Sequence, residues 1–92
     1  MVHYTLYKTT WGESRDKEYK RKYTDLIDAK RNAIKLFMKD VDTAYVQIYK
    51  YTDRGSDLYA VIGEDKNGFY YQSAKWSGLG KKQRMDADGW TR

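Results

Sequence analysis

Tyrosine is the residue type on which the chemistry of this chain must rest. Ten tyrosines, three tryptophans and two phenylalanines stand among 92 residues, which is too many aromatic rings for a disordered chain. A tyrosine ring stacks on flat groups, and its hydroxyl both donates and accepts hydrogen bonds. Tyrosines gathered on one surface can therefore hold a ligand without reacting with it. The candidates are those that share one side of the expected strands: Tyr7, Tyr45, Tyr49, Tyr51 and Tyr59.

Basic residues form two clusters near the two ends of the sequence. Residues 1–23 hold six Lys/Arg and three Asp/Glu, residues 75–92 hold five and two, and the stretch between is close to neutral, for a net charge of +5. The first cluster is Lys17, Lys20, Arg21 and Lys22, and the second is Lys81, Lys82 and Arg84, flanked by Trp76 and Trp90. Such asymmetry indicates an acidic partner, although a solvated charged surface explains it equally well.

No catalytic, metal-binding or nucleotide-binding motif in this sequence is specific enough to predict a function. His3 is the single histidine, and no partner carboxylate is implied by its position. The glycines and lysines of 78–82 lack the secure flanking strand and helix of a phosphate-binding loop. Aspartate pairs such as Asp86 and Asp88 lack the closing glutamate of a calcium loop. We therefore expect no enzyme activity, no metal and no cofactor.

The expected elements place the tyrosines on strands. Alternation over Val2–Thr10 predicts a strand, and Lys17–Tyr23 a second, polar one. An amphipathic helix of about four turns starts at Thr24 or Asp25 and runs to about Val41. Three further strands fill 44–76, with turns at 53–57 and at Asn67-Gly68. The prediction is an α+β domain over residues 1–76, with an antiparallel sheet of four to five strands, one helix packed on one face, and the order β-β-α-β-β-β. Residues 77–92 are predicted to be an irregular basic tail with a short helical turn near Lys81 to Met85.

The most informative expectation concerns which face of the sheet the single helix can cover. A single helix covers only one face of a sheet, so the aliphatic side chains belong under it: Val2, Leu6, Val46, Ile48, Leu58 and Ile62. The five candidate tyrosines, with either Tyr70 or Tyr71, then emerge on the other face. Lys30 falls inside the apolar arc of the helix, and we expect its amine to reach solvent. A tail that folds back through Trp76, Leu79, Met85 and Trp90 would instead bury the tyrosine face.

Two binding functions fit this expectation, and no family resemblance favours either. The first, which we favour from the sequence, is low-specificity binding of single-stranded nucleic acid. Bases would stack on the tyrosines, and phosphates would be held by the neighbouring cations Lys20, Lys22, Lys50, Lys81, Lys82 and Arg84. The second is a protein-interaction module, either a homodimer or an inhibitor or adaptor of a larger protein, that uses the same face. Tyrosines that merely stabilise the sheet by cross-strand pairing are the structural alternative. The absence of cysteine and of a long apolar stretch predicts a cytoplasmic protein with no membrane partner.

Overall fold

The chain folds as one helix packed on one face of an antiparallel sheet, so the α+β prediction is confirmed. The computed structural model describes residues 2–11, 17–39, 42–75 and 78–86. The elements are β1 (His3–Thr10), β2 (Lys17–Tyr23), α1 (Leu26–Lys39), β3 (Thr43–Thr52), β4 (Gly55–Asp65), β5 (Gly68–Lys75), β6 (Gly78–Leu79) and β7 (Gln83–Arg84). The strand order is β2-β1-β3-β4-β5-β6, and β7 pairs with β5 beside that path. The strand count exceeds the predicted four to five because of the two short strands β6 and β7.

Helix α1 begins where the sequence predicts. The Asp25 carboxylate accepts a hydrogen bond from the Ile27 amide at 2.9 Å, and the Asp25 carbonyl accepts one from the Ala29 amide at 3.1 Å. Asp25 is therefore the N-cap that satisfies a free amide of the first turn. Asp28 in the first turn and Lys39 in the last turn also suit the helix dipole.

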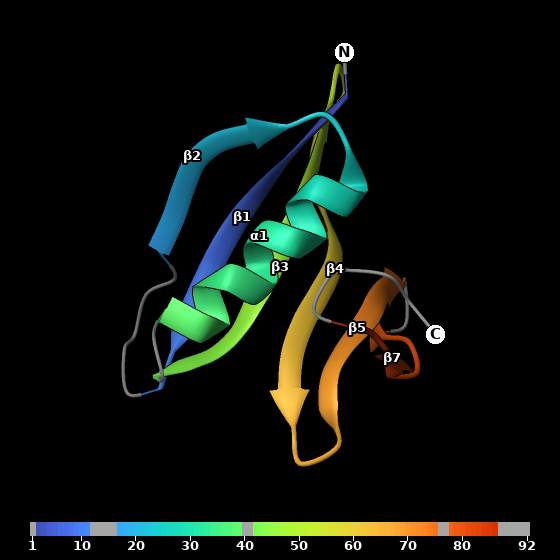
Figure 1. Ribbon diagram of the computed structural model, residues 1–92. Coiled ribbons are helices and arrows are strands. Elements are labelled where there is room, and N and C mark those ends of the chain that lie inside the picture. Colours follow the sequence, from blue (N-terminus) through green and yellow to red (C-terminus); the bar gives the residue numbers. More distant parts are fainter. Residues whose placement is uncertain (1, 12–16, 40–41, 76–77, 87–92) are drawn as a thin grey trace.

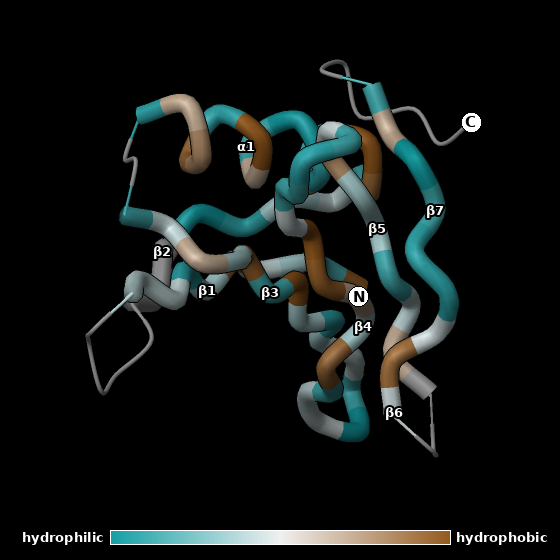
Figure 2. Tube along the Cα trace, turned by 90° about the horizontal axis from the view of Figure 1, so that it is seen from below, coloured by the Kyte–Doolittle hydropathy of each residue, from teal (hydrophilic) through white to brown (hydrophobic). Residues whose placement is uncertain are grey.

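The hydrophobic core lies between α1 and the sheet. Figure 1 shows α1 crossing β1, β3 and β4, and Figure 2 shows it lying on one side of the sheet only. Ala29, Ala33 and Ile34 of the helix are buried against sheet side chains that face the same way: Leu6, Val46, Ile48, Ala60, Ile62 and Tyr71. Val2, predicted to lie under the helix, is instead 43% exposed just before β1. No helix or strand of the described residues covers the opposite side of the sheet.

A β-bulge in β4 overturns the predicted faces of two residues. Ile48 pairs with Ala60, but its neighbour Tyr49 pairs with Leu58, so Tyr59 is an extra residue in the ladder. An extra residue exchanges the two faces of the strand on one side of the bulge. Tyr59 therefore turns toward the helix side, where it packs against the core. Leu58 turns to the uncovered side, and both face assignments made from alternation were wrong.

The described part of the predicted tail belongs to the sheet. Tyr70 and Tyr71 of β5 pair with β7, and the Met85 amide donates to the Phe69 carbonyl at 3.2 Å. Met85 is 4% exposed and lies in the core. The predicted helical turn at 81–85 is wrong, since β7 is extended there. Trp76 and Trp90, which were considered as a cover for the tyrosine face, lie outside the described residues.

The prediction for Lys30 was also wrong. Its side chain does not reach solvent but is 6% exposed, and its Nζ lies 4.2 Å from the centre of the Tyr71 ring. The π-face of a buried tyrosine attracts an ammonium group, so the charge stays inside the core. Burial lowers the pKa of Lys30 below its usual value.

Candidate binding face of the sheet

The surface of the sheet that faces away from α1, hereafter the open face, carries the candidate site. Strand pairing sets its side chains in rows. One row joins Thr9, Tyr45, Gly63, Tyr70 and Arg84 across five strands. The next row comprises Tyr7, Gln47, Val61 and Gln72, and the row after that joins Thr5, Tyr49 and Leu58. Directly paired residues project to the same side of a sheet, so these rows form one continuous surface.

Three of the predicted tyrosines form a tight cluster at one end of the open face. The Tyr7 and Tyr49 rings meet edge to face with centres 4.8 Å apart, and the Tyr7 and Tyr51 hydroxyls are hydrogen-bonded at 2.9 Å. The imidazole of His3 stacks on Tyr51 at 4.8 Å. The rings are therefore engaged with one another, which stabilises the pairing of β1 with β3 and rigidifies this end of the surface.

A hollow of about 320 Å³ occupies the middle of the open face. It is lined by apolar, aromatic and amide side chains: Tyr45, Gln47, Leu58, Val61, Tyr70, Gln72 and Leu79. Val61 is buried between the two glutamines of its row. The Gln72 amide donates to the Gly80 carbonyl at 3.0 Å. The Gln47 Oε1 is buried and accepts no hydrogen bond from the described residues.

Gly63 shapes one wall of this hollow. A Cβ atom at position 63 would overlap the Tyr70 ring at Oη and Cζ, so the ring lies directly over the glycine. The backbone at Gly63 does not have a positive φ, unlike the glycines of the turns. Glycine is needed here for the close approach of the ring, which is one of the reasons for glycine within a strand.

Cations border the open face at Tyr70, but a carboxylate already engages them. Arg84 holds Asp65 through two hydrogen bonds of 2.7 and 3.0 Å, and Lys82 lies 3.4 Å from the same carboxylate. The Arg84 guanidinium, together with the Asn67 amide, holds the pKa of Asp65 well below its usual range. The Lys82 ammonium also lies 4.4 Å from the centre of the Tyr70 ring. One face of that ring is therefore covered by a cation.

Two of the other predicted cations, Lys50 and Lys81, lie away from the tyrosines of the open face. Lys50 pairs with Tyr4 on the helix side, where its ammonium lies 5.5 Å from the Tyr59 ring. Lys81 lines a separate hollow with Ser73, Gly80 and Gln83. Lys22 is exposed on β2, and Lys20 lies in the same strand. Four strands, β1, β3, β4 and β5, lie between β2 and β7, so the two basic clusters stand about 24 Å apart along the sheet.

The predicted site is thus divided by the fold. Tyr7, Tyr49 and Tyr51 come together at one end, and Tyr45 lines the hollow with Tyr70, whose ring is the one beside Lys82. Tyr59 and Lys50 lie on the other side of the sheet. Reasoning from the sequence missed five of the seven residues that line the hollow: Gln47, Leu58, Val61, Gln72 and Leu79. Only Gly63, a glycine within a strand, signalled a close approach of side chains there.

Searches of family models, curated proteins and solved structures find no match to this chain. Among the described residues, no group of three or more His, Cys, Asp or Glu side chains is arranged to hold a metal ion. No helix within the same residues has the length and apolar character needed to cross a membrane.

Proposed function

We propose that this chain is a non-enzymatic binding domain that docks onto another protein through its open face. The observation that carries the proposal is the hollow lined by Tyr45, Leu58, Val61 and Leu79 on the uncovered side of the sheet. Tyrosines with aliphatic neighbours are the composition of interface centres, where side chains of the partner are desolvated. The locked cluster of Tyr7, Tyr49 and Tyr51 supplies a rigid margin that loses little entropy on binding.

The chemistry of the face specifies the partner. An apolar side chain of the partner suits Leu58, Val61 and Leu79. The chain carries a net charge of +5, so a partner with an acidic rim is attracted and a second copy of the same chain is repelled. A heteromeric complex is therefore favoured over a homodimer.

Single-stranded nucleic acid is the second candidate, favoured by one observation. Lys82 and Arg84 stand beside Tyr70 at the edge of the hollow, as a base-stacking site with neighbouring phosphate contacts requires. It ranks second because Asp65 already engages both cations and because Lys50 and Tyr59 lie on the other side of the sheet. Nucleic-acid binding would need the Asp65 ion pairs to open or to be shared.

Site-specific photocrosslinking tests the first candidate. A benzophenone side chain at Leu79, which is 48% exposed on the open face, is compared with one at Met38, which is 64% exposed on α1. We expect position 79 to crosslink to one acidic protein of the producing cells, and position 38 to crosslink to none. The unlabelled wild-type chain should compete for that partner, and a Leu79→Lys variant should not, because the lysine places a charge in the hollow.

Two results would contradict the proposal. One is crosslinking between copies of this chain from position 79, which would indicate a homodimer. The other is saturable binding of a random single strand that weakens steeply with salt, with a log–log slope of roughly −0.7 per phosphate contacted. That result would favour the nucleic-acid candidate.

We also propose that the chain works in the cytoplasm, on the basis of its cysteine-free composition. Fractionation of the producing cells tests this location directly.

A further inference from the structure

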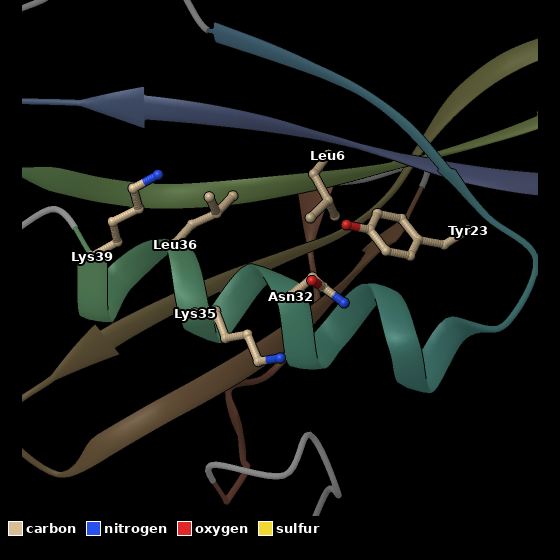
Figure 3. A pocket seen from close by; sticks show the side chains of 6 residues that line it. All are labelled: Leu6, Tyr23, Asn32, Lys35, Leu36 and Lys39. Atoms are coloured by element: carbon tan, nitrogen blue, oxygen red, sulfur yellow. The ribbon is translucent and has the colours of Figure 1, made fainter.

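A second concave site lies on the other side of the sheet, in the crevice between α1 and strands β1 and β2. Its volume is about 110 Å³, and it is lined by Leu6, Tyr23, Asn32, Lys35, Leu36 and Lys39. Figure 3 shows Tyr23 reaching from β2 toward Leu6, while Leu36 points from the helix toward the strands. The floor and one wall of the crevice are therefore apolar.

The crevice forms because the helix and the edge strand diverge. Figure 1 shows α1 lying over β1, β3 and β4, whereas β2 curves away at the edge of the sheet. Register between β1 and β2 also shifts between Tyr4 and Leu6, which bends the edge strand. Tyr23 remains buried and spans part of the gap, but it does not close it.

Positive charge stands on the helix side of this apolar crevice. Lys35 and Lys39 are one helical turn apart, and Asn32 precedes Lys35 by three residues, so the three share one stripe of α1. The described lining holds two ammonium groups and no carboxylate. The Asn32 amide nitrogen donates to the Asp28 carbonyl at 2.8 Å, which leaves the amide oxygen as the remaining polar group of that side chain.

We propose that this crevice binds a small organic carboxylate that carries a single ring or a short branched chain. The apolar group would occupy the space between Leu6, Tyr23 and Leu36, and the carboxylate would pair with Lys39. Charge selects the anion: Figure 3 shows the Lys39 ammonium on the side of the strands, where it can pair with an anionic head, while Lys35, one turn earlier and directed to the other side of α1, adds to the positive potential. Size limits the apolar group, since the crevice of about 110 Å³ is smaller than the roughly 150 Å³ cavity that encloses benzene, so a single ring would fill it and leave its substituent at the open mouth. The site is distinct from the open face, because the sheet separates the two.

Titration of the ¹⁵N-labelled 92-residue chain with phenylacetate tests this inference. We expect saturable shifts confined to the amides around Leu6, Tyr23 and residues 32–39, with a Kd of about 1 mM or tighter for a ligand of this size. Phenylacetamide has the same ring and shape without the charge, and it should bind about tenfold more weakly or worse.

Variants separate the crevice from general attraction to a basic protein. Lys35→Gln with Lys39→Gln should weaken phenylacetate binding about tenfold, while Lys66→Gln, at an exposed turn, should leave it unchanged. Unchanged affinity in the double variant would overturn the inference. Equal binding of the amide, shifts spread over all basic residues, or no saturable shift would each do the same.

Discussion

Gly63 and Tyr70 show how a single residue without a side chain shapes the open face. The ring of Tyr70 occupies the volume that any Cβ at position 63 would need. The Lys82 ammonium lies against the Tyr70 ring, and the ring also forms a wall of the hollow. The shape of the candidate interface therefore depends on a pair of residues whose roles are complementary.

Gly63→Ala is expected to destabilise the fold by about 1–3 kcal/mol, because the added methyl group displaces the Tyr70 ring. The same change in a Tyr70→Ala background should cost less than about 0.5 kcal/mol, since the obstructing ring is gone. Urea unfolding of the four chains of this cycle measures both values. An equal cost in the two backgrounds would show that Tyr70 does not lie over Gly63.

Lys30 makes stability depend on pH in a direction opposite to that of the buried tyrosines. Its pKa is lowered by burial, so the folded chain releases this proton at lower pH than the unfolded chain does. Stability should therefore rise as the pH increases from the lowered pKa toward 10.5, the usual value. Burial raises the pKa of Tyr4, Tyr23 and Tyr71 above 10.0. Because the unfolded chain then ionises first, stability should fall above about pH 10.

Lys30→Met is expected to remove the rise and to keep the fall above pH 10. At pH 7 the variant should be more stable by about 1 kcal/mol, because an apolar chain of similar length replaces a buried charge. Urea unfolding between pH 7 and 11 measures this, with Lys66→Met, at an exposed turn, as the control that should retain the rise. A loss of stability in Lys30→Met at every pH would mean that the contact with Tyr71 outweighs the cost of burial.

At the scale of elements, strand β4 contains both positions whose face the sequence predicts correctly and positions whose face it predicts wrongly. Alternation placed Val46 and Ile48 of β3 and Ile62 of β4 correctly in the core, because these positions lie in regular ladder pairs. It failed at Leu58 and Tyr59, because a bulge depends on how two strands pair and leaves no mark in the alternation of either. The pairing of the charged side chains of β4 and β7 was likewise unpredictable, since Asp65 and Arg84 are brought together only by the tertiary fold.

The bulge makes a prediction that reverses the one from alternation. Tyr59→Lys should destabilise the fold by about 2–4 kcal/mol, because the ring packs against the core and Tyr4. Leu58→Lys should cost less than about 1 kcal/mol, since its stem can lie along the open hollow with the amine in water. Thermal and urea unfolding of the two variants provide the comparison. A greater loss in Leu58→Lys would mean that β4 pairs without the bulge.

At the scale of the whole molecule, the two sides of the sheet have different roles. One side is closed by α1 and holds the core, with the small basic crevice at its margin. The other side presents tyrosines, amides and aliphatic groups that no described element covers. The layer count from the sequence predicted this division, because one amphipathic helix was the only element long enough to cover a face. It did not predict that the cations would be distributed over both sides.

Solvent exposure of the open face is the property on which the binding proposal depends most directly. It is measured on the free protein by NMR with a soluble nitroxide that broadens signals of exposed groups. We expect the Leu79 and Leu58 methyl signals and the Tyr45 ring signals to broaden along with Met38, while Ile34 and Ile62 of the core stay sharp. Open-face signals as protected as those of Ile34 would show that the face is buried within the chain, and would contradict the proposed interface.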